Sequence, residues 1–125
     1  MATKGASNLY GSSKNGKHGR PTSHINFAYA KAFNKSTRKD HFDRHGSSMG
    51  FVSEQQYEQH AIRFANNIDR KRCVSFVDKK TGATYKYNKV TNELAIIKKD
   101  GIIVTYFRPK DGYNYYKKNK KQKEK

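Results

Sequence analysis

The sequence is poor in acidic side chains, in cysteine and in long apolar runs. Its 125 residues hold only 10 Asp and Glu against 27 Lys and Arg, and no tryptophan. The one cysteine, Cys73, excludes an intramolecular disulfide. No apolar run approaches the roughly 18 residues of a membrane-spanning helix, and we expect no secretion signal in this chain. The scarcity of carboxylates also argues against a nuclease that holds two metal ions.

Positive charge and aromatic side chains are abundant instead. The formal net charge is +17, and nine Tyr and seven Phe bring the aromatic share to 13%. A sequence pI of about 10.0 with clustered Lys and Arg is typical of proteins that bind a polyanion such as nucleic acid. The alternative is that the charge serves only solubility. A mass of 14.4 kDa fits one domain with a single modest core.

The apolar content falls at both ends of the chain. Residues 1–22 are rich in Gly, Ser, Asn and Lys, and we predict a disordered basic tail because little apolar surface offsets the entropy of ordering. Residues 117–125 are Lys-rich and are predicted to be a second tail. The folded domain is therefore expected over residues 23–116. If both ends flank one groove, their charge would attract a phosphate backbone into it.

Two helices are predicted in the first half of the chain. The shorter covers residues 37–45, with Thr37 as its cap and Gly46 ending it in the left-handed conformation. The longer begins at the cap Ser53, continues with apolar residues at helical spacing, and ends near Asn67.

Turn residues at regular spacing predict an antiparallel meander after residue 72. Asp100 and Gly101 form a strong hairpin signal, and Pro109 should end the last strand because it has no N–H for the ladder. Residues 23–33 mix strand-like alternation with helix-favouring alanines, so their state stays open. The fold class is α+β, with N-terminal helices packed on a four- or five-stranded antiparallel sheet. The predicted strands are Cys73–Asp78, Ala83–Asn88, Glu93–Lys98 and Gly101–Arg108.

His41 and His45 are the first candidates for chemistry. They are four residues apart on a predicted helix and therefore share a face. An imidazole has an unperturbed pKa near 6.5, which suits proton transfer at neutral pH. The same spacing occurs at zinc sites, although no Glu directly follows His41. Two exposed histidines that bond the last helix carbonyls are a further alternative.

The last predicted strand adds a hydroxyl and a guanidinium. Strand alternation places Thr105 and Phe107 on one face and Tyr106 and Arg108 on the other. Arg108 is at the strand end, where a guanidinium can bind a phosphate with two hydrogen bonds. Thr and Tyr are also favoured in strands for packing alone, so this pattern has an ordinary structural explanation as well.

Lysines beside tyrosines give two candidate binding segments. Tyr85, Lys86 and Tyr87 have an order suited to phosphate contact and base stacking, or equally to an edge strand guarded by lysine. Tyr113 and the tyrosines that follow it precede Lys117, and they can stack bases or pack the chain end onto the sheet.

Several of these segments resemble one family. The runs His41–Gly46, Met49–Phe51, Tyr85–Asn88 and Asp100–Pro109 resemble, in this order, C-terminal ribonuclease domains of bacterial polymorphic toxins. Such domains include contact-dependent inhibition and LXG-type effectors and are grouped in the BECR (barnase–EndoU–colicin–RelE) fold. The resemblance covers about residues 36–116. It implies metal-independent RNA cleavage in which a 2′-hydroxyl attacks the adjacent phosphate, leaving 2′,3′-cyclic phosphate and 5′-hydroxyl ends.

The resemblance also implies residue roles and partners. It implies no cofactor and no metal, a substrate RNA of which tRNA is one candidate, and an acidic cognate immunity protein. Delivery into the cytoplasm of a target bacterium within a larger effector is implied as well, or a cytoplasmic location for a standalone form; we expect a monomer. The implied proton-transfer residues are His41 and His45, the residues that stabilise the phosphate are Thr105, Arg108 and Lys86, and the residues that stack a base are Tyr87, Tyr106 or Tyr113.

Two other functions stay open at this point. A non-catalytic RNA- or ribosome-binding module would use the same basic, tyrosine-rich surface but would not need both histidines. A DNA-acting toxin or a phage protein that packs on nucleic acid is the third possibility.

Overall fold

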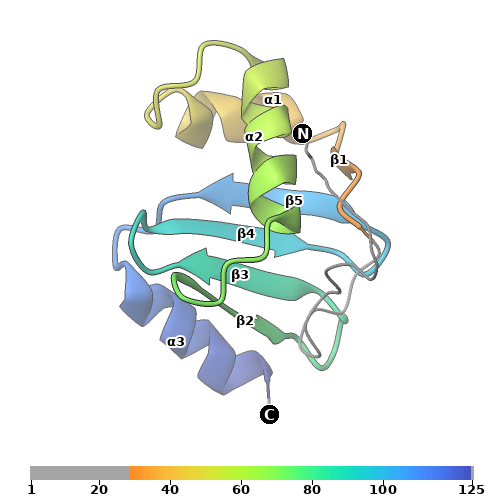
Figure 1. Ribbon diagram of the computed structural model, residues 1–125. Helices are drawn as coiled ribbons and strands as arrows, with labels where there is room; N and C mark the ends of the chain where they lie inside the picture. Colours follow the sequence, from red (N-terminus) through yellow and green to blue (C-terminus); the bar gives the residue numbers. More distant parts are fainter. Residues whose placement is uncertain (1–28, 125) are drawn as a thin grey trace, which may run out of the picture.

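A five-stranded sheet with helices on both faces forms the protein (Figure 1). The structure, a computed structural model, describes residues 29–124. The strand order is β1-β5-β4-β3-β2, with β1 parallel to β5 and the other neighbours antiparallel. This confirms the predicted α+β class. The elements are β1 Ala32–Phe33, α1 Arg38–His41, the π-helix η1 Phe42–Gly46, α2 Glu54–Asn66, β2 Cys73–Val77, β3 Thr84–Asn88, β4 Glu93–Ile97, β5 Ile102–Phe107 and α3 Tyr113–Lys123.

The antiparallel meander is confirmed, with each strand within a residue or so of its predicted ends. Gly101 adopts φ 91°, which favours glycine, and its N–H donates to the carbonyl of Lys98 in the predicted hairpin turn. The carboxylate of Asp100 accepts the N–H of Ile102. β5 ends before Pro109, as expected.

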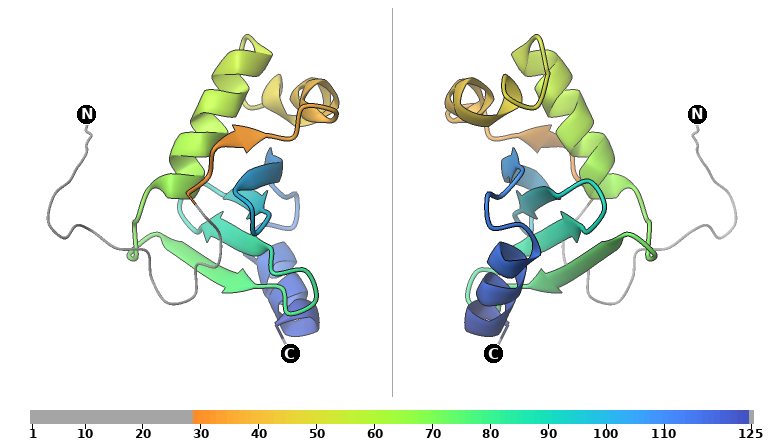
Figure 2. Two further views of the ribbon diagram at one scale, coloured as in Figure 1. Left: turned by 90° about the vertical axis from the view of Figure 1, so that its right-hand side faces the viewer. Right: turned by 90° about the vertical axis from the view of Figure 1, so that its left-hand side faces the viewer.

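The two faces of the sheet carry different layers (Figure 2). Helix α2 covers one face, hereafter the α2 face, which presents Ala95, Ile97 and Tyr106. Helix α3 covers part of the other, the α3 face, which presents Tyr85, Leu94 and their neighbours. Helices α1 and η1 lie along the β5 edge, and side chains from them reach the α3 face at that edge. Two apolar cores result, one beneath each of the longer helices.

Helix α2 begins and ends where the sequence predicts. The hydroxyl of Ser53 accepts the N–H of Gln56, and the side chain of Gln56 accepts the N–H of Val52. Tyr57 and Ala61 on its buried stripe have no exposed surface. The phenol of Tyr57 donates to the backbone carbonyl of Tyr106, which ties α2 to β5.

The predicted left-handed end at Gly46 is wrong. The short helix continues through the π-turn η1, and the glycine that has positive φ near its end is Gly50, at 95°. Gly46 is instead buried at a close approach, where a Cβ atom would lie 2.7 Å from Phe42 Cδ1 and 2.9 Å from Tyr57 Cδ1. The side chain of Thr37 also does not cap α1, although Thr37 occupies the predicted position.

The predicted C-terminal tail is wrong over residues 117–123, which continue helix α3. Tyr116 anchors this helix, since its buried ring packs against Phe76 and Tyr87. The N–H of Lys79 donates to the carbonyl of Lys123 and holds the last turn. The domain therefore extends beyond residue 116. The predicted tail 1–22 lies outside the described residues.

The open question of residues 23–33 is answered in part. Ala32 and Phe33 form the parallel strand β1, and residues before 29 are not described. None of the helices within residues 29–124 is both long and apolar enough to cross a bilayer.

Candidate active site

A hydrogen bond joins the short helix to the last strand of the sheet. His41 Nδ1 lies 3.1 Å from Thr105 Oγ1, although the two residues are 64 positions apart in the sequence. The His41 ring also packs against Phe33, with 5.6 Å between the ring centroids. Because Thr105 engages Nδ1, the other ring nitrogen, Nε2, is the one left for a substrate.

His45 extends the cluster by one helical turn. Its ring centroid lies 5.7 Å from that of His41 and 5.1 Å from that of Phe107. Phe107 in turn meets Tyr115 of α3 edge to face, with 5.6 Å between centroids. We call His41, His45, Phe107 and Tyr115 the aromatic row. The row runs from the β5 edge across the α3 face to α3, and Thr105 lies beside it.

The surroundings of both histidines favour the neutral imidazole. Burial lowers the pKa of His41 and of His45, and the positive charge of Arg44 lowers both further. Asp40 acts in the opposite direction, but its carboxylate also binds Arg44 at 2.8 Å. A neutral imidazole at neutral pH can accept a proton, as a general base must.

Ion pairs fix α1 to its surroundings. The Arg38 guanidinium binds Glu54 at 3.1 Å and Glu58 at 2.7 Å, both on α2. The second oxygen of Glu58 accepts the N–H of Phe33 in β1 at 2.8 Å. One carboxylate therefore links α1, α2 and β1, and it sets the position of the helix that carries His41.

Arg108 and Thr105 lie on opposite faces, as strand alternation predicts, so the structure does not bring together the two residues to which the resemblance gives a shared phosphate role. Arg108 follows β5 on the α2 side, near His60 and Tyr106. Burial lowers the pKa of His60 and raises that of Tyr106, and the positive charge of Arg108 is a smaller influence that favours the deprotonated form of each. His60 Nε2 lies 3.7 Å from a carboxylate oxygen of Glu93, and the phenol of Tyr106 donates to the same oxygen. Residues an odd number apart on a strand face opposite sides, which explains the separation. The sequence reasoning missed the pair His60 and Glu93.

The predicted phosphate contact of Lys86 is also wrong. Its side chain is 4% exposed on the α2 face, and Nζ donates to the carbonyls of Ala65 and Asn67 at the end of α2. The ammonium also lies 5.4 Å from the ring centroid of Phe64. Burial lowers the pKa of Lys86 to about 8. Lys86 therefore caps the C-terminus of α2 with a buried ammonium group.

Buried Lys86 should make the protein more stable as the pH rises above neutrality. Its pKa is about 8 in the fold against a reference value of 10.5, so between these values the unfolded chain binds a proton that the folded protein does not. The free energy of unfolding should then rise by about 1 kcal/mol from pH 7 to pH 9. Denaturant titrations at both pH values measure this rise.

The controls for this prediction are two lysine variants. Lys86→Met should lack the rise, whereas Lys89→Met, at an exposed position, should keep it. Comparing the variants at the same pH cancels the contribution of other titrating groups to the free energy of unfolding. Cys73 is one such group, because burial raises its pKa. An equal rise in Lys86→Met would show that another group causes it.

Of the three tyrosines predicted to stack a base, two are buried. Tyr106 has no exposed surface, and Tyr87 is 3% exposed, with its hydroxyl donating to Asn92. Tyr113 is 40% exposed and stacks on Tyr87 at 5.6 Å, and Lys117 lies 5.0 Å from its ring centroid. The expectation is thus wrong for Tyr87 and Tyr106, because α3 and α2 cover the faces they point to.

Phe107 and Tyr115 adjoin the two histidines; Tyr115 is one of the tyrosines that the sequence offered for base stacking or packing, whereas Phe107 was not among the predicted site residues. Strand alternation places Phe107 on the same side as Thr105, and that signal was available in the sequence. Among residues 29–124, no three His, Cys, Asp or Glu side chains gather as a metal site requires. No protein-family model and no curated protein matches the sequence.

Proposed function

We propose that the protein is a metal-independent endoribonuclease. The observation that carries this proposal is the pair of half-buried histidines whose ring centroids lie 5.7 Å apart, with His41 held by Thr105. Burial lowers the pKa of both, which favours the neutral form that a general base needs. Two hydrogen bonds of about 2.6–3.2 Å each, made to opposite sides of one phosphate, span a gap of this order. The two imidazoles can therefore contact one phosphodiester.

The reaction follows from this geometry. One imidazole accepts the proton of the ribose 2′-hydroxyl while the 2′-oxygen forms a bond to phosphorus. The bond from phosphorus to the 5′-oxygen breaks, and the other imidazole donates a proton to that leaving oxygen. A bound phosphate raises the pKa of the imidazole beside it, which lets one of the two carry this proton. The products are a 2′,3′-cyclic phosphate and a 5′-hydroxyl.

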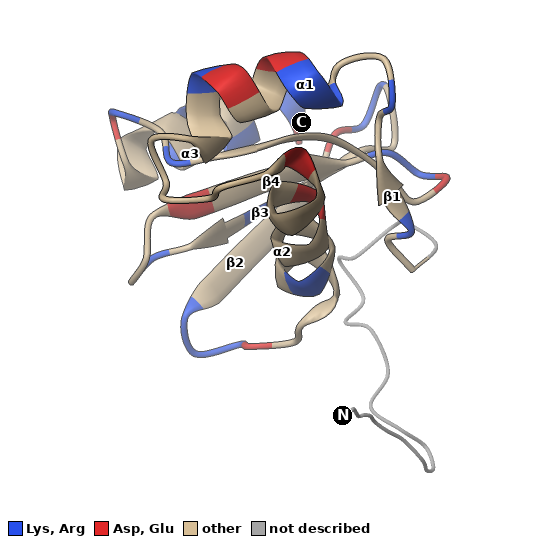
Figure 3. Cartoon of the chain, turned by 90° about the horizontal axis from the view of Figure 1, so that it is seen from above, with Lys and Arg blue, Asp and Glu red and all other residues tan. Residues whose placement is uncertain are grey.

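The surrounding charge supports an RNA substrate. Lys and Arg residues lie on α1, on α3 and in the loops between strands (Figure 3). Arg44 lies on the helix that carries both histidines, where it can stabilise the charge that develops on the phosphate. Binding that relies on such residues falls steeply as salt rises. An acidic immunity protein that covers the same surface stays a prediction.

The test is cleavage of RNA in excess EDTA. Purified protein is mixed with total bacterial RNA and with a labelled single-stranded oligonucleotide, and the product ends are analysed chemically. We expect discrete cuts with 2′,3′-cyclic phosphate and 5′-hydroxyl ends. Products with 3′-hydroxyl and 5′-phosphate ends would contradict the mechanism. Intact RNA at every protein concentration, together with salt-sensitive RNA binding, would favour the non-catalytic binding module.

A further inference from the structure

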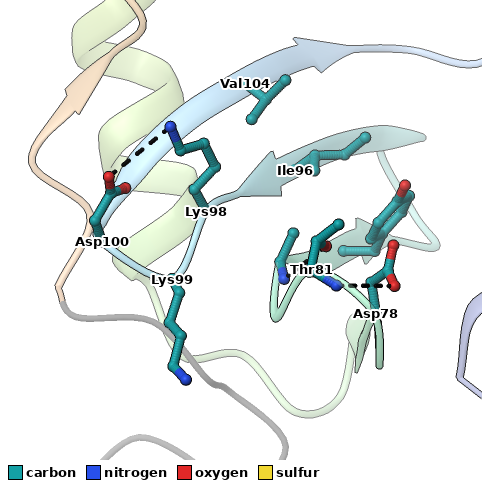
Figure 4. A pocket seen from close by; sticks show the side chains of 9 residues that line it. Asp78, Thr81, Ile96, Lys98, Lys99, Asp100 and Val104 are labelled. Atoms are coloured by element: carbon teal, nitrogen blue, oxygen red, sulfur yellow. Dashed lines mark hydrogen bonds and ion pairs between the residues drawn. The ribbon is translucent and has the colours of Figure 1, made fainter.

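A pocket opens on the α3 face between two β-turns (Figure 4). Its volume is about 500 Å³, within the range of about 300–1,000 Å³ typical of small-molecule sites. Tyr85, Ile96 and Val104 supply an apolar floor, and the turns that follow β2 and β4 supply polar walls. The Tyr85 ring is fixed, since it stacks on Phe76 with 4.6 Å between ring centroids.

The pocket adjoins the candidate active site. Ile96 pairs with Thr105 across the β4–β5 ladder, whereas Ile97 pairs with Ile103, so Val104 is an extra residue of β5. A bulge of this kind bends a strand and redirects its side chains, often beside an active site. Two floor residues, Ile96 and Val104, are thus immediate neighbours of the threonine that binds His41.

Charged groups line the rim of the pocket. Lys98 and Lys99 are exposed on the turn after β4, and Lys98 Nζ lies 3.9 Å from the carboxylate of Asp100 (Figure 4). On the opposite wall, Asp78 Oδ1 accepts the backbone N–H groups of Lys80 and Thr81. The pocket therefore combines an apolar floor, two lysines of which Lys98 pairs with Asp100, and the oriented carboxylate of Asp78.

We propose that this pocket is a nucleobase subsite for the nucleotide next to the scissile phosphate. The base lies on the floor formed by Tyr85, Ile96 and Val104, and Lys98 and Lys99 contact the following phosphate. This inference rests on the proposed function and specifies its substrate as RNA that is single-stranded at the cut. A base can enter a pocket only when it is unpaired, and duplex RNA buries its bases.

The carboxylate of Asp78 gives the subsite a preference. A carboxylate accepts hydrogen bonds from amino groups on a base edge, as Asp and Glu do from cytosine. Adenine, cytosine and guanine carry such an amino group, and uracil does not. The subsite should therefore disfavour uracil. In Asp78→Asn the remaining side-chain oxygen can still accept the N–H groups of the turn. The new amide NH2 would donate a hydrogen bond to a base carbonyl, which uracil offers. This variant should therefore shift the preference toward uracil.

The experiment measures RNA binding separately from cleavage. In the His41→Ala background, fluorescence anisotropy follows binding of four short labelled single-stranded RNAs that differ in one base, and of the matching duplex. We expect the uracil variant to bind about five- to tenfold more weakly than the others, and Asp78→Asn to reduce or reverse this difference. The duplex should bind more weakly than the single strands.

A matched pair of double variants tests whether the base preference comes from the pocket or only from the loss of positive charge. Lys98→Ala with Lys99→Ala should reduce the salt dependence of binding by up to about 1.4 in log–log slope and reduce the base preference. Arg70→Ala with Lys71→Ala removes the same charge from the connection between α2 and β2 and should leave the base preference unchanged. Thermal unfolding of each variant verifies the fold.

The outcomes separate the subsite from the proposed function. If wild-type protein cleaves RNA but base identity has no effect and the two double variants behave alike, the subsite is overturned and the ribonuclease proposal stands. If wild-type protein does not cleave RNA but binding shows the expected preference, the ribonuclease proposal fails and the pocket is a base-binding site of an RNA-binding protein.

Discussion

Replacement of His41 or His45 by alanine should lower kcat/KM for RNA cleavage by about 10²–10⁴-fold, the usual contribution of general acid–base catalysis. The expected loss follows from the position of both imidazoles beside Thr105 and Phe107, where one nitrogen of His41 is already held and the other is left for the substrate. Initial rates on a labelled single-stranded RNA in excess EDTA measure the effect, with circular dichroism to verify the fold.

His60→Ala is the matched control for this prediction. His60 is also half-exposed, and burial also lowers its pKa, but it lies on the α2 face beside Glu93. We expect cleavage close to the wild-type rate in this variant. The reverse result, with activity lost in His60→Ala and kept in both other variants, would move the active site to His60, Glu93 and Arg108.

Gly46→Ala should lower the free energy of unfolding by about 1–3 kcal/mol, as overpacking a core commonly does. The added methyl group would lie 2.7 Å and 2.9 Å from ring carbons of Phe42 and Tyr57, closer than real Cβ contacts come. Tyr57 is fully buried and its phenol is bonded to the backbone of β5, so its ring has little freedom to move. Urea denaturation monitored by circular dichroism measures the change.

The same substitution should also reduce cleavage, because His45 directly precedes Gly46 and must shift with the π-turn. Ser47→Ala, one residue further at an exposed position, should change neither stability nor activity. An unchanged denaturation midpoint in Gly46→Ala would mean that Phe42 rotates away without loss, and that the close approach does not position the site.

Elements with strong local signals were predictable from the sequence. The hydroxyl of Ser53 and the spacing from Tyr57 to Ala65 define α2 by contacts within one helix. The hairpin at Asp100 and Gly101 is specified by backbone conformations that few residues adopt. The proximity of His41 and His45 needed only helical periodicity. The contact of His41 with Thr105 is a tertiary one, and only the family resemblance pointed to it.

The predictions that the structure contradicts concern residues whose local pattern does not show which element will pack against them. Alternation places Lys86 and Tyr106 on one face of the sheet, but it does not say that α2 covers that face. Helix α3 contains five lysines from residue 117 onward and buries only one residue, Tyr116, so its sequence shows no apolar stripe at helical spacing. A lysine-rich segment of this kind has the composition of a disordered tail. Here it is a helix, because the ring of Tyr116 packs against Phe76 and the N–H of Lys79, just after β2, donates to the carbonyl of Lys123.

The two-residue strand β1 has a consequence for local stability. It provides the only parallel pairing among the described strands, and two residue pairs protect few amides from exchange with solvent. Segments with so few bonds open at a lower free energy than the meander, in which each strand is paired over several residues. Opening of β1 and α1 would withdraw His41 from Thr105 while β2 to β5 stay folded. The proposed RNA cleavage would then depend on the docking of this one short segment, and spectroscopic signals from the sheet would not detect its release.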